Sequence, residues 1–187
     1  MQIRFLFLVL LMVVGLNATT PTKENVTRLY IATFDRAPDS AGIDYWIYES
    51  GLNLEGIASS FFEQPETIYL YRDVSDTVPF TELSYADAFI SDIYYNLFKR
   101  GADHAGISYW AGELMSGNII PSHFILAVIN GAVGDDKKIL DNKTEVALVF
   151  ADSGLEDIAI SEEIMDGVDA TDQSVIDALN RFGLGED

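Results

Sequence analysis

Residues 29–46 read LYIATFDRAPDSAGIDYW, and residues 93–110 read IYYNLFKRGADHAGISYW. At this offset of 64 positions, nine of the eighteen residues are identical, and both tryptophans of the protein occupy the same place in the two stretches. The shared pattern is Tyr-x-x-x-Phe-x-Arg-x-x-Asp-x-Ala-Gly-Ile-x-Tyr-Trp. A repeat of this kind indicates that one supersecondary unit is used twice. Because each unit is short, we expect the two copies to share one core.

Apolar residues on both sides of the motif recur every three or four positions, which is the spacing of an amphipathic helix. In the first copy, Thr22 is expected to cap the first helix and Pro38 to end it. Asp39 or Ser40 is then expected to cap the second helix. The second copy repeats the same apolar stripe after Ser84.

A third helix is predicted in each copy. In the first copy it covers 54–64 and is closed by Pro65, and in the second copy it begins near Pro121. Two more helices are predicted after Asp135 and after Thr171 or Asp172, the last with Ile176 facing inward. No segment shows the alternation of a strand. The sequence therefore predicts an all-α protein, with two helix-loop-helix-helix units packed together and a helical C-terminal extension. The predicted divisions are a signal peptide at 1–18, a first repeat unit at 22–72, a linker and hinge at 73–83, a second repeat unit at 84–134 and the extension at 135–187.

Most of the shared side chains are assigned to architecture. The Arg36 guanidinium can bond the last helical carbonyls or pair with Asp39, whose carboxylate can also accept from the amides of the following turn. The glycines permit close approach of helices, and the tryptophans lie on the apolar side of their helix, where a large aromatic side chain is typical of the core. A ligand-binding role for the Arg and Asp pair is the alternative. The structural set is Tyr30, Phe34, Arg36, Asp39, Gly42 and Trp46 in the first copy, and Tyr94, Phe98, Arg100, Asp103, Gly106 and Trp110 in the second.

Two tyrosines of the motif are candidates for binding. Tyr45 and Tyr109 each precede a tryptophan, and adjacent residues point about 100° apart around a helix. If the tryptophans face the core, both tyrosines are therefore partly exposed. A partly exposed tyrosine can contact a sugar ring or another ligand.

The motif resembles that of a bacterial domain of unknown function, the family numbered four-two-one-four, over roughly residues 24–134. The first copy fits the family pattern fully, whereas the second has Ala102 in place of a proline. Residues 142–146 also resemble the stretch that follows tandem copies of this domain. The resemblance implies an exported or surface-associated bacterial protein, because members of the family are of that kind. The motif is also similar to that of phycobilisome linker polypeptides, although the acidic charge and the N-terminal segment argue against that role.

The N-terminal segment has the order of a secretory signal peptide. Arg4 is followed by an apolar run over 5–16 and then by Asn17 and Ala18. Twelve helical residues reach roughly 18 Å, which is short of the ~30 Å hydrocarbon core of a membrane. We expect cleavage after Ala18 and a protein that is secreted, periplasmic or on the cell surface, with no membrane span after cleavage.

Composition excludes several classes of function. The 187 residues include 30 Asp and Glu against 11 Lys and Arg, and this formal charge of −19 repels the phosphates of nucleic acids. The absence of cysteine excludes disulfides, thiolate metal sites and thiol catalysis. Since 49% of the residues are hydrophobic, the chain is expected to form a compact core.

Signals for metal binding and catalysis are weak. His104 and His123 are not shared by the two copies, and their separation matches no short zinc spacing. Two acidic groups lack the ligand order of an EF-hand, namely Asp135, Asp136 and Asp141, and Asp166, Asp169 and Asp172. No nucleophile elbow, phosphate loop or dinucleotide fingerprint is present. We expect no cofactor and no enzymatic activity, while weak calcium binding stays open.

Together these features predict an exported bacterial protein with a non-catalytic binding or assembly module. Its expected partner is another surface or extracellular protein or a second copy of itself. The alternative is recognition of an extracellular polysaccharide through Tyr45 and Tyr109. Hydrolysis of a glycan by a pair of carboxylates ranks last among the hypotheses.

Overall fold

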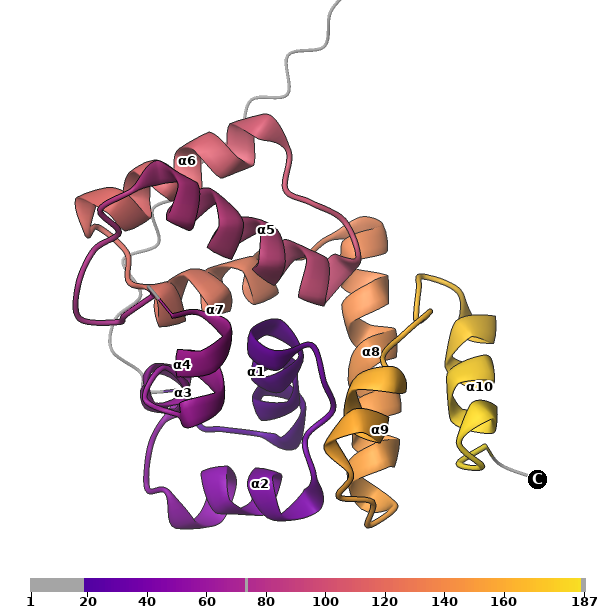
Figure 1. The fold of residues 1–187 in the computed structure, drawn as a ribbon. Coiled ribbons are helices and arrows are strands. Elements are labelled where there is room, and N and C mark those ends of the chain that lie inside the picture. The colour runs from indigo at the N-terminus through magenta and orange to yellow at the C-terminus, as the bar shows by residue number, and fades with distance from the viewer. Residues whose placement is uncertain (1–18, 73, 186–187) are drawn as a thin grey trace, which may run out of the picture.

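The computed structural model describes residues 19–72 and 74–185, and Figure 1 shows an arrangement of helices. Within these residues there is no strand, which confirms the all-α prediction. The signal peptide predicted at 1–18 lies outside the described residues. Among the helices that are described, none is both long and apolar enough to cross a membrane.

The helices are short and follow one another closely along the chain. In order, they are α1 (Lys23–Phe34), α2 (Ser40–Asp44), the π-helical turn η1 (Tyr45–Glu49), α3 (Leu54–Phe61), α4 (Pro65–Leu70), α5 (Leu83–Phe98), α6 (His104–Ser116), α7 (Pro121–Gly131), α8 (Gly134–Asp152), α9 (Ile158–Glu163) and α10 (Asp172–Arg181). We call residues 22–72 the first unit and residues 84–134 the second unit.

Helix α1 lies at the centre of the molecule and packs against α3, α5, α7 and α8. In Figure 1, α5 and α6 lie above α1, α8 runs down one side, and α10 lies on the outer side of α8. The buried apolar side chains of these helices form a single cluster, with Phe89 of α5 in contact with aromatic rings from α7 and from the segments between α3 and α5. Residues of both units therefore contribute to one core.

Side-chain caps fix several helix starts at the predicted residues. Thr22 is the N-cap of α1 and forms a capping box with Asn25. Asp39, rather than Ser40, caps α2, and Thr171 caps α10. In each case the side-chain oxygen accepts a hydrogen bond from an amide of the first turn, which otherwise has no helical partner.

Two predicted helix ends in the first unit are wrong. Helix α1 ends at Phe34, several residues before Pro38, because Asp35 adopts a left-handed conformation with φ of 50°. Helix α3 ends at Phe61, and Pro65 does not close it but begins the unpredicted helix α4. Proline suits that position because its missing N–H has no intrahelical acceptor in the first turn.

The second helix differs between the units. In the first unit, α2 passes into the π-helical turn η1, where Ser50 N donates to Tyr45 O over 2.8 Å. In the second unit, the α-helix α6 runs without interruption from His104 to Ser116. The apolar spacing of the sequence does not predict this π-helical turn. Such turns are rare and often mark functional positions.

The described part of the segment between the units, residues 74–82, has no helix and is anchored to the second unit. Asp76 Oδ1 accepts a hydrogen bond from Ser122 N over 2.8 Å and so caps the start of α7. Phe80 is buried and its ring lies 5.7 Å from that of Phe89. These contacts hold the segment on the second unit, and the hinge predicted at 73–83 stays a prediction.

The C-terminal extension contains the two predicted helices, α8 and α10, and a third that the sequence analysis does not predict, α9. Val175 and Ala178 of α10 are buried. The expectation for Ile176 is wrong, because this side chain is half-exposed. It lies about 100° around the helix from Val175, away from α8.

A charged cluster joins the two units to the extension. Lys99 Nζ lies 2.9 Å from Asp35 Oδ2, and Lys143 Nζ lies 3.2 Å from Asp35 Oδ1. Asp35 and Lys99 occupy the same position of the motif, just after α1 and α5, and both have left-handed φ values. We call Asp35, Lys99 and Lys143 the charge junction.

Lys143 of α8 is the buried member of the charge junction. Its side chain has 0% exposure, and its Nζ also donates to Asn96 O. Burial lowers the pKa of Lys143 to about 8, although the charge of Asp35 acts in the opposite direction. Burial disfavours the charged form of an amine, so the folded protein holds this proton less tightly than the unfolded chain does.

Replacing Lys143 with Met should change how stability depends on pH. Between pH 8 and about 10, the unfolded chain keeps the Lys143 proton while the folded protein loses it, so the free energy of unfolding rises with pH. This contribution is at most about 1.4 kcal/mol per pH unit, and Lys143→Met should remove it. Urea denaturation at several pH values measures the difference between the two proteins.

Lys138→Met is the matched control for this prediction. Lys138 lies on the same helix, α8, but its side chain is half-exposed and pairs with Asp172 at the surface. The control should keep the pH dependence of the wild-type protein over the same range. If the free energy of unfolding changes equally with pH in the wild type and in Lys143→Met, the lowered pKa of Lys143 is contradicted.

Candidate functional site

The tyrosine and tryptophan of the motif are hydrogen-bonded to each other in both units. Trp46 Nε1 donates to the Tyr30 hydroxyl over 3.1 Å, and Trp110 Nε1 donates to the Tyr94 hydroxyl over 3.3 Å. Trp46 is buried, as predicted, whereas Trp110 is only partly buried. Each bond links the first helix of a unit to its second helix.

The arginine of the motif does not pair with the aspartate of the motif. Arg36 Nε and Nη2 donate to the two carboxylate oxygens of Glu66 in α4, each over 2.8 Å, and Nη1 donates to Ala37 O. The guanidinium also lies over the rings of Tyr30 and Phe34, 5.1 and 5.3 Å from their centroids. The predicted Arg36–Asp39 salt bridge is therefore wrong, and Arg36 ties α4 to α1.

The second unit has the same arrangement with another partner. Arg100 donates from Nε and Nη2 to both carboxylate oxygens of Asp136 in α8, and it lies over the rings of Tyr94 and Phe98. The Arg100 side chain is 49% exposed, compared with 11% for Arg36. The sequence analysis does not predict either acidic partner, because Glu66 and Asp136 are not separated by the repeat offset.

The aspartates of the motif are helix caps. Asp39 Oδ1 accepts from Gly42 N, and Asp103 Oδ1 accepts from Gly106 N, each over 2.7 Å. The glycine is needed most in the first unit, where a Cβ on Gly42 would lie 2.7 Å from the Tyr30 hydroxyl oxygen. The corresponding atom on Gly106 would lie 3.2 Å from its nearest neighbour, the carboxylate oxygen Asp103 Oδ1.

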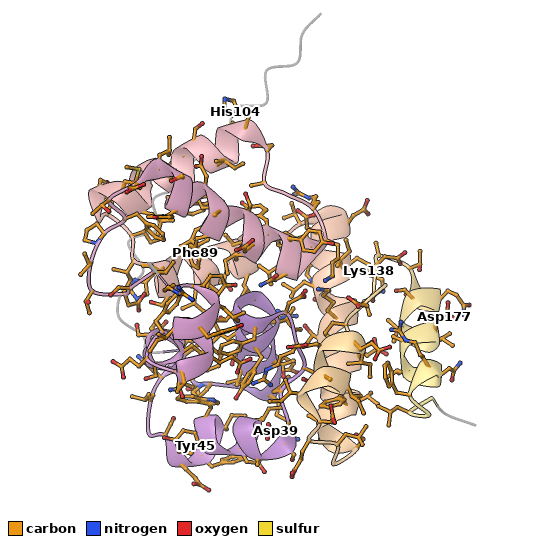
Figure 2. All side chains as sticks on the ribbon, in the orientation of Figure 1. Asp39, Tyr45, Phe89, His104, Lys138 and Asp177 are labelled. Atoms are coloured by element: carbon orange, nitrogen blue, oxygen red, sulfur yellow. The ribbon has the colours of Figure 1, made fainter. Side chains whose placement is uncertain are left out.

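The two candidate binding residues have the predicted exposure. Tyr45 and Tyr109 are each 48% exposed, and each ring meets the neighbouring tryptophan edge-on, with centroids 5.0 and 4.9 Å apart. Figure 2 shows Tyr45 at the end of the molecule formed by α2, and Figure 1 shows α6, which carries Tyr109, at the opposite end. The fold therefore does not combine them in one site.

Two hollows lie elsewhere on the surface. The larger one, about 740 Å³, lies among α1, α3 and α7 and is lined by Glu24, Arg28, Glu55 and His123, among others. The smaller one, about 340 Å³, lies between α10 and the loop before it. Neither is lined by Tyr45 or Tyr109.

The residues considered for metal binding are dispersed. His104 is exposed at the start of α6, and His123 lies in the larger hollow. The acidic candidates mostly have protein partners: Asp136 pairs with Arg100, Asp141 with Arg28 and Lys137, and Asp172 with Lys138, while Asp169 accepts from Thr171. No group of three or more potential metal ligands occurs in residues 19–72 and 74–185.

Comparison with known families identifies part of the chain. Residues 79–131 match the family described as "Domain of unknown function (DUF4214)". The match covers the second unit and the end of the preceding segment. No curated protein and no solved structure matches the chain significantly.

The two arginines of the motif should differ in their contribution to stability. Arg36→Ala should lower the free energy of unfolding by about 3 kcal/mol, because it leaves Glu66 without a partner and removes the cover of two buried rings. Arg100→Ala should cost about 1 kcal/mol or less, because the pair that it breaks is half-exposed to water. Chemical denaturation of both variants measures the difference. Equal losses of the free energy of unfolding in the two variants would contradict the prediction.

The two glycines of the motif provide a second comparison within one molecule. Gly42→Ala should destabilise the protein by about 1–3 kcal/mol, because the new methyl group displaces the Tyr30 hydroxyl from Trp46. Gly106→Ala should be near neutral, since alanine favours a helix and the exposed Asp103 can shift. Thermal melts, with tryptophan fluorescence as the readout, separate the two outcomes.

Proposed function

We propose that the protein is exported and acts outside the cytoplasm as a non-catalytic assembly module, which contacts other proteins through Tyr45 and Tyr109. One observation carries the proposal. These two tyrosines stand at the same place in the repeated motif, have the same exposure and lie at opposite ends of the molecule. Two such contact points suit a protein that connects two neighbours.

The proposal includes the view that the two units are copies of one DUF4214-like domain. The family match, at residues 79–131, does not include the first unit. In support, both units contain the same tyrosine–tryptophan bond, the same bidentate arginine pair and the same aspartate cap. The shared sequence therefore corresponds to shared contacts, which is the expected behaviour of a duplicated unit.

The contacts of the motif also favour binding over catalysis. Its aspartates accept from helical amides, and its arginines are held by carboxylates and aromatic rings. Among the aromatic members of the motif, Tyr45 and Tyr109 are the ones with large exposed surfaces. Tyrosine is enriched at protein interfaces because it combines an apolar ring with a hydroxyl group.

Charge constrains the kind of partner. After removal of residues 1–18, which contain Arg4, the chain would have 10 basic against 30 acidic side chains, a charge of −20. Two copies of such a chain repel each other at low ionic strength. We therefore favour a different protein with a basic contact surface. Its binding should weaken as salt is added, whereas self-association should strengthen.

Substitution of the exposed tyrosines tests this function. Tyr45→Ala and Tyr109→Ala should each weaken capture of the partner from the cell-envelope fraction by about tenfold, as expected for an aromatic residue at an interface, with little change in stability. Tyr85→Ala is the matched control, because Tyr85 is 44% exposed but lies outside the motif. If all three variants capture the partner equally, the tyrosines are not the contact points.

The polysaccharide alternative predicts a different result, which the same tyrosine variants can test. Since each tyrosine lies about 5 Å from a tryptophan, a glycan bound there should change tryptophan fluorescence without any protein partner.

Export is tested by fractionating cells and sequencing the N-terminus of the protein, which we expect to begin at Thr19. A chain that stays in the cytoplasm with residues 1–18 attached would contradict the proposal.

A further inference from the structure

The larger hollow contains a carboxylate that lacks part of its hydrogen bonding. It lies among the N-terminal parts of α1 and α3 and the helix α7, and Glu55 of α3 is one of the residues that line it. Glu55 Oε2 is buried and has no hydrogen-bond partner in the structure. A buried carboxylate oxygen is costly without a donor, and the cost is larger when the group is charged.

The charged neighbours in the hollow do not supply this donor. The Arg28 guanidinium donates instead to Asp141 and Thr144, away from Glu55. Glu24 is acidic and accepts from the Thr22 hydroxyl. His123 also lines the hollow, but it makes no hydrogen bond with Glu55. The hollow is thus lined by two acidic side chains, and one carboxylate oxygen of Glu55 has no donor.

Thr19 is held against this carboxylate by two contacts. Its carbonyl oxygen accepts from Leu54 N over 3.0 Å, and its hydroxyl donates to Glu55 Oε1 over 3.1 Å. The Thr19 nitrogen is only three covalent bonds from that hydroxyl oxygen, so it lies within about 4 Å of it in any rotamer. Because the hydroxyl lies 3.1 Å from Glu55 Oε1, the nitrogen lies within about 7 Å of this carboxylate oxygen.

We propose that removal of residues 1–18 creates an ammonium group on Thr19 that binds Glu55 and completes this site. The inference rests on the proposed export and on cleavage after Ala18. Hydrolysis of the Ala18–Thr19 peptide bond by a signal peptidase consumes one water molecule, leaves a carboxylate on Ala18 and gives Thr19 a protonated amine. The amide has one proton to donate and no charge, whereas the ammonium has three protons and a positive charge.

Cleavage therefore has a structural consequence besides release from the membrane. The new ammonium neutralises an acidic hollow and anchors the start of the mature chain to α3, next to the N-terminus of α1. The mature protein is then more stable than the precursor. A less stable precursor is compatible with passage through a translocation channel in an unfolded state.

The experiment compares a free with an acetylated N-terminus on the chain that begins at Thr19, which contains every residue of the described core. Acetylation removes the charge and keeps the backbone. In urea at pH 7 and low salt, we expect acetylation to lower the folding equilibrium constant about fivefold, as for loss of a partly exposed ion pair. In Glu55→Gln the acetylated and free proteins should be equally stable.

Glu24→Gln is the matched control, because Glu24 lines the same hollow but binds Thr22 instead of Thr19. This variant should keep the effect of acetylation. If Glu55→Gln does not fold, the wild-type comparison at 1 M salt replaces it, since screening should remove most of the acetylation effect. An acetylation effect that is absent, or that is the same with and without Glu55, overturns the inference.

This outcome is distinguishable from failure of the proposed function. The acetylation experiment uses purified protein and does not depend on export. If the exported protein begins at a residue other than Thr19, the ammonium site is overturned while export stands. If the protein begins at Thr19 but acetylation has no effect, export and cleavage stand and only the ion pair is overturned.

Discussion

Each unit depends on one hydrogen bond between a tyrosine hydroxyl and a tryptophan indole. In the first unit, the Tyr30 hydroxyl accepts from Trp46, which draws the second helix onto α1. The same hydroxyl leaves no room for a side chain at Gly42, and the same ring is covered by the Arg36 guanidinium. Three further positions of the motif, Trp46, Gly42 and Arg36, are therefore constrained by where the Tyr30 side chain lies. A polar bond in a buried setting specifies one helix pairing rather than many.

The two units make these contacts with different strength. In the first unit, Trp46 and Arg36 are almost fully buried, and Gly42 faces a tight contact. In the second unit, Trp110 and Arg100 are partly exposed, and Gly106 has more space. The first unit contains α1, which lies at the centre of the core, whereas α6 of the second unit lies at the outside. Burial, not the motif itself, sets how much each shared contact stabilises the fold.

The sequence predicts those features that depend on neighbours along the chain. Caps such as Thr22, Asp39 and Thr171, the burial of Trp46 and the exposure of the tyrosines all follow from helical spacing. The sequence does not predict the features that depend on tertiary contacts. Neither Glu66 nor Asp136 can be recognised as the partner of an arginine 30 or 36 residues away, because many other acidic residues are available. The buried state of Lys143 is hidden for the same reason, since lysine is ordinarily exposed.

The charge junction explains why the two units associate with each other in this orientation. The position after the first helix is Asp35 in one unit and Lys99 in the other, so the pair attracts where two identical units would repel. Lys143 then brings α8 to the same point, so the C-terminal extension is positioned by both units at once. With the inner ends of the two units fixed in this way, α2 and α6 are left at opposite ends of the molecule. The separation of Tyr45 from Tyr109 follows from this arrangement of helices, and under the proposed function it keeps the two tyrosines apart as separate contact points.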